Sequence, residues 1–214
     1  MIFVRDSFNL HPASPETLDR FCGVAQDRLL PAVEQAGGQT VGAWFCHEEW
    51  FSQVVHVTAF EDLPAYGDFR QAAGGDGSLA DACSAISELA PERGTELMET
   101  LGPIAEKTLD DAIEKSQAEP AGVYTFAILD VLPGCMGRFK ELLGAAGPML
   151  PIVASWRHLS GNPDRITDLW SGDTGSFGYS PSTDQTAAFF GPLREVAARE
   201  RMMRLHVLPH SKLR

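Results

Sequence analysis

One arrangement of residues occurs twice in this sequence, and it constrains the fold more than any other feature. Trp44 closes an apolar segment and is followed after twelve residues by His56 within a second apolar segment; Trp156 and Asp168 repeat this arrangement at the same interval. An alternating apolar run and an amphipathic helical stretch precede each pair. The repetition predicts a duplicated unit of strand, helix, strand, strand and helix, at about residues 1–75 and 121–200, although chance recurrence of common elements is the alternative.

The predicted domain boundary lies at Pro120-Ala121-Gly122, where turn-forming residues precede a new apolar run. We therefore expect a first unit over residues 1–119 and a second over 120–214. The stretch 78–119 is rich in Ala, Glu and Leu, and it predicts two or three helices without a strand. Helices on one face of each sheet would leave the other face bare, so the two sheets are expected to pack together into a barrel-like core.

The overall charge narrows the classes of partner. Lys and Arg number 17 against 29 Asp and Glu, which gives a net charge of -12. Such a chain repels phosphate backbones and anionic bilayers, so we expect no nucleic-acid partner and no membrane partner. The 4 cysteines have no close pair, and the first residues enter a strand pattern directly. Both features favour a cytoplasmic protein without disulfides.

Several segments of the first unit resemble the NIPSNAP family. The resemblance rests on these segments and on the chain's last residues: Leu29-Leu30-Pro31, Gly37-Gly38, Val41-Gly42-Ala43-Trp44, Val54-Val55-His56-Val57, Phe60-Glu61-Asp62-Leu63 and Arg204 to Arg214. It implies an α+β fold with two ferredoxin-like repeats forming an intramolecular dimeric alpha/beta-barrel. The second half departs from the pattern in placing Asp168 where the first has His56, and in its shorter first helix. Relatives of this fold include cofactor-free monooxygenases, cyclases, lactone isomerases and haem enzymes.

Strand alternation predicts which side chains share the barrel interior. We expect His56 to act as a general acid or base near neutral pH, and Asp168 to support His158 across adjacent strands. A histidine hydrogen-bonded in the core and an ordinary cross-strand pair are the alternatives. The expected walls and ligand-binding side chains are Trp44, Trp156, Trp170, Arg5 and Thr58.

Two other motifs are weaker candidates for a metal or phosphate site. His47-Glu48-Glu49 lacks the spacing of a metal site, and Gly172 to Ser180 lacks that of a phosphate loop. An acidic turn and a loop at the barrel mouth are the expected structures. No motif indicates haem attachment, so we expect neither metal nor cofactor.

The sequence thus leaves two functions open. The first is a small-molecule-binding protein that transfers a proton on an apolar or aromatic metabolite, as an isomerase, cyclase or monooxygenase does without a cofactor. The second is a non-catalytic binding or scaffold protein with a packed barrel core. Homo-oligomerisation is left open by both.

Overall fold

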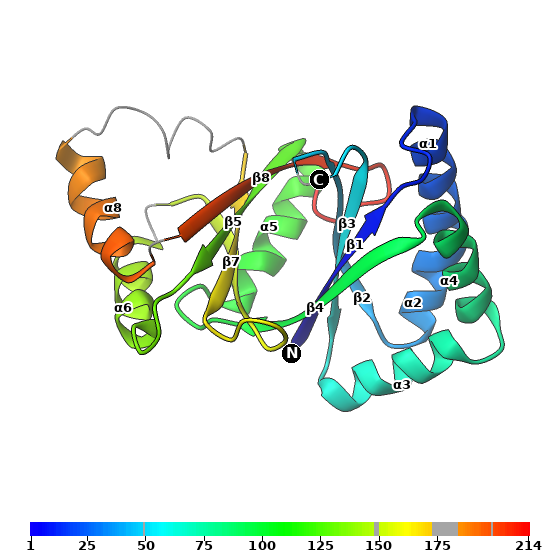
Figure 1. The fold of residues 1–214 in the computed structure, drawn as a ribbon, viewed down its shortest axis with the longest axis horizontal. Coiled ribbons are helices and arrows are strands. Elements are labelled where there is room, and N and C mark those ends of the chain that lie inside the picture. Colours follow the sequence, from blue (N-terminus) through cyan, green and yellow to red (C-terminus); the bar gives the residue numbers. More distant parts are fainter. Residues whose placement is uncertain (49, 148–149, 173–183, 198) are drawn as a thin grey trace. The chain divides into compact units, whose positions relative to one another are not determined.

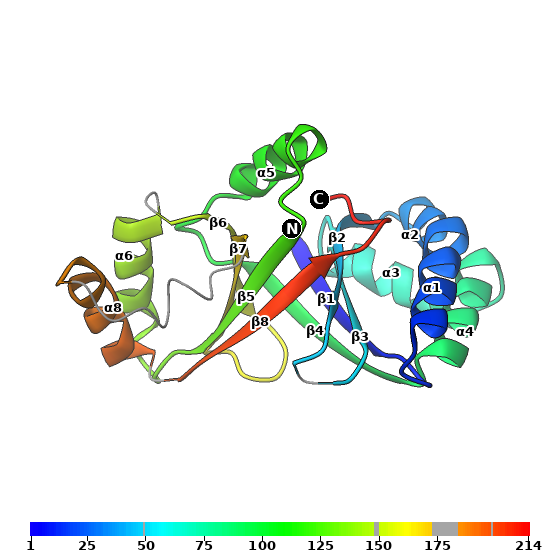
Figure 2. The same ribbon diagram turned by 90° about the horizontal axis from the view of Figure 1, so that it is seen from above.

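The chain folds as an α+β protein in which helices and antiparallel strands alternate (Figures 1 and 2). The structure is a computed structural model that describes residues 1–48, 50–147, 150–172, 184–197 and 199–214. The strands are β1 (Ile2–Asn9), β2 (Gln39–Cys46), β3 (Gln53–Phe60), β4 (Glu92–Thr100), β5 (Val123–Asp130), β6 (Ile152–His158), β7 (Arg165–Ser171) and β8 (Arg199–Val207). The helices are α1 (Pro15–Val24), the π-helix η1 (Ala25–Leu29), α2 (Leu30–Gln35), α3 (Leu63–Gly74), α4 (Ser78–Leu89), α5 (Glu106–Ala118), α6 (Met136–Ala146) and α8 (Asp184–Val196).

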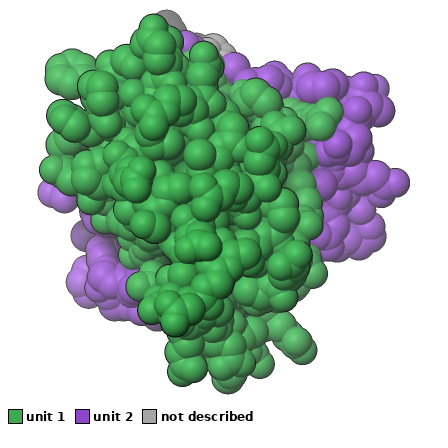
Figure 3. Space-filling model, turned by 90° about the vertical axis from the view of Figure 1, so that its right-hand side faces the viewer, with its two compact units in different colours: residues 1–97, 206–214 green, residues 98–205 purple. Residues whose placement is uncertain are grey.

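Two compact units make up the chain, coloured separately in Figure 3. Unit 1 comprises Met1–Leu97 and His206–Arg214, and unit 2 comprises Met98–Leu205. β4 and β8 run from one unit into the other along the chain. Across the described residues, the hydrogen-bonded strand order is β1-β3-β2-β8-β5-β7-β6-β4, a closed barrel. The α+β class and the antiparallel barrel expected from the sequence are confirmed.

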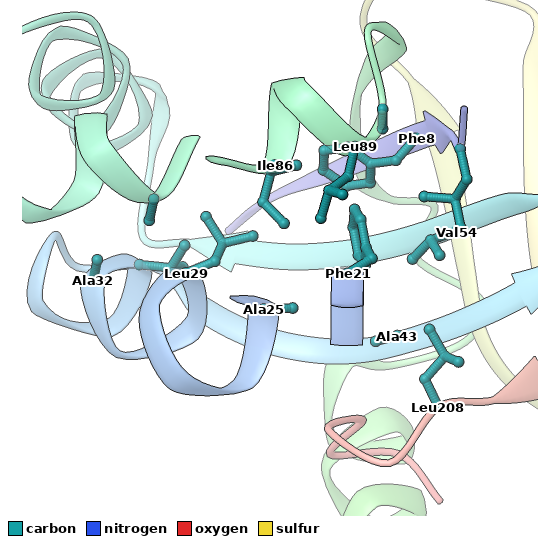
Figure 4. Packing of buried hydrophobic residues seen from close by; sticks show 14 of the residues in the cluster. Phe8, Phe21, Ala25, Leu29, Ala32, Ala43, Val54, Ile86, Leu89 and Leu208 are labelled. Carbon is teal, nitrogen blue, oxygen red and sulfur yellow. The ribbon is translucent and has the colours of Figure 1, made fainter. Parts of the chain in front are cut away.

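In unit 1, β3 is the central strand and pairs with β1 and β2. Ser14 caps α1 by accepting a hydrogen bond from the Thr17 amide, and Pro15 follows at a position where its missing donor costs nothing. The apolar faces of the helices cover one side of the sheet, where Phe8 and Val54 from the strands meet Phe21 and Ile86 from the helices (Figure 4). This cluster is the hydrophobic core of unit 1.

In unit 2, β7 is the central strand and pairs with β5 and β6. Helix α6 contributes Phe139 and Leu143 to a second core, and Val196 at the end of α8 joins them. The strand side of this core includes Ile152 and Trp170. Each unit therefore has its own sheet and its own helix-covered core.

The stretch 78–119 differs from its all-helical prediction. It contains α4 and α5, but between them Glu92–Thr100 forms β4. This strand holds three glutamates and a glycine and buries only Met98, so its composition carries no strand signal. Pairing with β6 at Met98, Glu99 and Thr100 overrides that local preference.

The compact units divide at Leu97, ahead of the expected boundary at residues 119 and 120. The expected boundary lies between α5 and β5 and stays a prediction. Among the described residues, no helix combines the length and the apolar character needed to span a membrane.

Candidate functional site

A cavity lies within unit 2, between the sheet and the helices that cover it. Its volume is about 220 Å³, which is enough for a small organic molecule. Exposed Ala145 and Glu200 belong to its lining, so the cavity reaches the surface at that end. Its described lining residues are Ala127, Leu129, Phe139, Leu142, Leu143, Ala145, Leu150, Ile152, Asp168, Trp170, Phe190, Pro192, Leu193 and Glu200.

Asp168 is the one buried charged residue of the described lining, with 4% of its surface exposed. It lies at the middle of β7, opposite Ala127 of β5 and Ser155 of β6. Directly opposed residues of antiparallel strands share a face, so all three side chains lie on the side that the helices cover. The Ser155 hydroxyl donates a hydrogen bond to Oδ1 of Asp168 at 2.5 Å.

Burial, with a smaller contribution from the nearby Glu200 carboxylate, raises the pKa of the Asp168 carboxyl to about 7 against the lowering effect of the Ser155 hydrogen bond. The apolar surroundings disfavour the charged form. No Lys, Arg or His belongs to the described lining, so none of these residues offsets the effect there. The carboxyl is thereby able to gain or lose a proton close to neutral pH.

Trp170 lies two residues further along β7 on the same face, opposite Thr125 and Ile152. Its side chain is 6% exposed, and it joins Phe139 and Phe190 as the aromatic part of the wall. An apolar, partly aromatic pocket with a few polar groups is typical of small-molecule sites. The arrangement can hold an apolar ligand and exchange a proton with it through Asp168.

The structure places His56 in the packed core of unit 1, away from the expected barrel interior. His56 lies opposite Ala43 and Asp6, on the helix-covered face, with Phe8 and Phe21 edge-on to its ring at centroid distances of 5.3 and 5.7 Å. Its Nε2 lies 3.1 Å from Nε2 of His210. Burial lowers the pKa of His56 to about 3, so the imidazole is neutral at physiological pH.

The expected pairing of Asp168 with His158 is absent. Trp156 lies opposite Thr167, and the Nε2 atom of His158 is 2.8 Å from the Thr167 hydroxyl. These residues occupy the sheet face opposite to that of Asp168, because side chains alternate along each strand. The expectation was wrong because strand alternation alone does not fix the register, and a bulge between Ile152 and Ala154 shifts β6 by one residue.

The same register error separates the other expected residues of unit 1. Trp44 lies opposite Val55, so it points away from the face that holds His56. Arg5 lies opposite Val57 on that second face and forms an ion pair with Glu96. Thr58 shares the helix-covered face and borders a space of only about 30 Å³ in unit 1.

Where the structure describes them, the remaining sequence motifs add no second site. In the described part of the chain, no group of three or more His, Cys, Asp or Glu residues is placed to hold a metal ion. Glu49 and most of the Gly172 to Ser180 loop lie outside the described residues.

Sequence reasoning missed the part of the site that comes from the helices and from β8. Phe139 and Leu143 showed helical spacing, which predicts a buried face but not a gap beside it. Glu200 is the second residue of β8 and lies in a charged stretch of sequence without a strand pattern. The cavity is a result of how the elements pack, and no residue type in the sequence predicts it.

Comparisons with known proteins support the fold. A proposed monooxygenase of Fusobacterium nucleatum matches with a TM-score of 0.63 at 10% identity, over 97% of this chain and 92% of that one. A proposed monooxygenase of Lactobacillus acidophilus matches with a TM-score of 0.57 at 13% identity, over 95% of this chain and 92% of that one. An anthrone oxidase-like protein matches with a TM-score of 0.55 at 12% identity, over 99% of this chain and 93% of that one.

At such identities the likeness concerns the fold alone. No protein-family model matches the chain, and no curated protein matches it. The resemblance to the NIPSNAP family therefore stays a prediction from the sequence.

Proposed function

We propose that this protein binds a small, largely apolar molecule in the cavity of unit 2 and that Asp168 transfers a proton to or from it. The observation that carries the proposal is the buried carboxyl at the wall of an apolar cavity, with a pKa of about 7. A general base is most effective when its pKa lies near the working pH. No metal or cofactor is needed for this step.

The fold relatives suggest the reaction in which the proton is used. Asp168 as carboxylate would remove a proton from a weakly acidic C–H next to a carbonyl group, leaving its electron pair on carbon. Dioxygen, as the oxidant, would accept those electrons and form a C–O bond. The peroxide anion would then recover the proton from Asp168, and loss of water from the hydroperoxide would give a second carbonyl. Isomerisation needs only the first step and the return of the proton to another carbon.

We also propose that the chain is NIPSNAP-like and arose by tandem duplication. The order of elements supports this, since each unit contains a strand, helical segments, a hairpin of two strands and a further helix.

The alternative function is that of a non-catalytic binding protein. It would use the same cavity, and the experiment below separates the two.

The test uses 2-tetralone, a bicyclic ketone with a weakly acidic C–H, incubated with the protein in D₂O without oxygen. Mass spectrometry follows deuterium uptake into the ketone. We expect protein-dependent exchange, and Asp168→Asn should slow it by about 100-fold or more, the usual contribution of a general base. Asp110→Asn removes an exposed carboxylate from α5 of the same unit and should leave the rate unchanged.

Equal exchange rates for the wild type and Asp168→Asn would rule out the proton-transfer role. Binding of 2-tetralone without any protein-dependent exchange would favour the non-catalytic alternative. Admitting air to the wild-type sample then tests oxygenation, which predicts oxygen uptake in proportion to ketone consumed.

A further inference from the structure

The cavity of unit 2 contains acidic groups and no basic group to balance them. Among its described lining residues, only Asp168 and Glu200 have an ionisable side chain. Asp168 lies on β7 with 4% of its surface exposed, and Glu200 lies on β8 at the exposed end of the cavity. The rest of the described lining is apolar or aromatic. Two carboxyls therefore set the electrostatic potential inside the cavity.

The undescribed residues of unit 2 supply no positive charge either. The sequence contains no Lys, Arg or His from residue 141 to 156 or from residue 166 to 193, and these stretches include all of those residues except Ala198. Arg194, in the last turn of α8, is exposed and lies outside the described lining. Partial burial raises the pKa of Glu200 by more than Arg194 lowers it. This carboxyl is therefore incompletely balanced.

A carboxylate without a counter-charge is costly in an apolar site, because the charged form loses its water. The charge of Glu200 contributes to the raised pKa of Asp168, so the two carboxyls lie close enough to interact. A bound cation would stabilise both charges, and Coulombic attraction acts over several ångströms without a fixed direction. An anion would be repelled. A neutral ligand would displace water and leave the carboxyls unbalanced.

We propose that the ligand of this cavity is an organic cation, a protonated amine on a small aromatic or alicyclic skeleton. This rests on the proposed function and names its substrate class. The skeleton occupies the apolar interior, and the ammonium group lies toward Glu200, where an ion pair keeps part of its water. Aromatic rings in the wall also favour a cation. Arg194 already lies over the ring of Phe190, 5.8 Å from its centroid.

Such a ligand would convert Asp168 to the form that removes a proton. The positive charge favours the carboxylate of Asp168, so binding of the cation drives the carboxyl proton into solvent. The carboxylate is the base that the proposed reaction needs. A neutral apolar ligand has the opposite effect, because it removes water from the carboxyl and favours the protonated form. Proton release on binding therefore distinguishes the two ligand classes.

The experiment compares three molecules of one skeleton: the cation 2-aminotetralin, the neutral 2-tetralone and the anion tetralin-2-carboxylate. Affinities are measured by calorimetry at pH 7. We expect the cation to bind at least about tenfold more tightly than the ketone, and the anion more weakly than both. Glu200→Gln should weaken binding of the cation by about tenfold and that of the ketone by less than about twofold. Glu195→Gln removes an exposed carboxylate of α8 outside the described lining and should change neither.

A second measurement uses the wild type alone. Calorimetry in buffers of different ionisation enthalpy counts the protons exchanged on binding. The cation should release up to about half a proton at pH 7, where Asp168 is half protonated, and the ketone should release none. In Asp168→Asn the release should disappear.

The outcomes separate this inference from the proposed function. Equal affinities for the cation and the ketone, or cation binding without proton release, overturn the inference while the proposed role of the cavity and Asp168 stands. Equal weakening of cation binding by Glu200→Gln and Glu195→Gln also overturns it, because it would show a general attraction to an acidic protein. Failure of all three molecules to bind contradicts the proposed function itself.

Discussion

Asp168 and His56 occupy matching places in the two sheets, and burial shifts both toward their neutral forms. Each lies on the central strand of its unit, on the face that the helices cover. His56 is enclosed by packed aromatic rings, whereas Asp168 faces a cavity. Both residues were singled out in the sequence by their equal spacing from a preceding tryptophan. Only the structure shows that one side chain has room for a ligand beside it.

The raised pKa of Asp168 predicts how stability depends on pH. Between its ordinary value of 3.8 and about 7, the folded state holds a proton that the unfolded state has released. This contribution to the unfolding free energy is therefore full below pH 3.8 and declines as the pH rises to 7, by at most about 1.4 kcal/mol per pH unit. Urea unfolding of the wild type and Asp168→Asn at pH 5 and pH 7.5 checks this. Relative to the wild type, the variant should be more stable at pH 7.5 than it is at pH 5. If the difference in unfolding free energy between the two proteins is the same at both pH values, the prediction is contradicted.

Gly42 makes possible the close packing of a buried tryptophan. A Cβ atom at this position would lie 2.3 Å from the Trp44 ring, and Trp44 is completely buried. We expect Gly42→Ala to lower the unfolding free energy by about 2 kcal/mol, since overpacking a rigid core ring typically costs this much. Gly23→Ala is the matched control, because nothing lies within 4 Å of its Cβ position in α1 and alanine favours a helix. Denaturant titration should show the first variant destabilised and the second equal to wild type or more stable.

At the scale of elements, the C-terminal segment 206–214 belongs to unit 1 and is fixed along β2. The amides of Leu208 and Leu213 donate to the carbonyls of Ala43 and Val41, each at 3.0 Å. The Ser211 hydroxyl accepts from the Ala43 amide at 2.9 Å. The Nε2 contact between His210 and His56 anchors the segment to the core, so this tail is an integral part of the fold.

The histidine contact makes the segment sensitive to acid. Burial lowers the pKa of His56 to about 3 and that of His210 to about 4, below the ordinary 6.5. The unfolded state therefore binds more protons from pH 6.5 downward, and stability is lost as the pH falls through this range. Hydrogen-exchange protection of the Leu208 and Leu213 amides, corrected for intrinsic rates, should drop between pH 7 and pH 4.5. Ser211→Ala should lower it at both pH values, whereas pH-independent protection in the wild type would contradict the account.

The elements that sequence reasoning found are those with strong local signals. Ser14-Pro15 predicts the start of α1, and the apolar alternation of β2 and β3 predicts their hairpin. β4 was missed because its glutamates favour solvent and only its pairing partners make it a strand. The sheet faces were misassigned because a bulge between Thr40 and Gly42 shifts the register of β2, as one does in β6. Register is a tertiary property, and side-chain alternation does not encode it.

At the scale of the whole chain, the two units have the same order of elements but different interiors. The space beneath the helices is about 30 Å³ in unit 1 and about 220 Å³ in unit 2. The shorter helix expected in the second half agrees with this difference, since α6 has 11 residues while α1, η1 and α2 run on without interruption from residue 15 to residue 35. The proposed ligand binding therefore belongs to unit 2. Cytoplasmic location and homo-oligomerisation stay predictions.

The central claim is that Asp168 carries a proton that it can exchange near neutral pH. The most direct measurement is the ¹³C chemical shift of its side-chain carboxyl as a function of pH, assigned by the signal missing from Asp168→Asn. We predict a titration midpoint near 7. A midpoint near 4, the value of an ordinary exposed aspartate, would contradict the account.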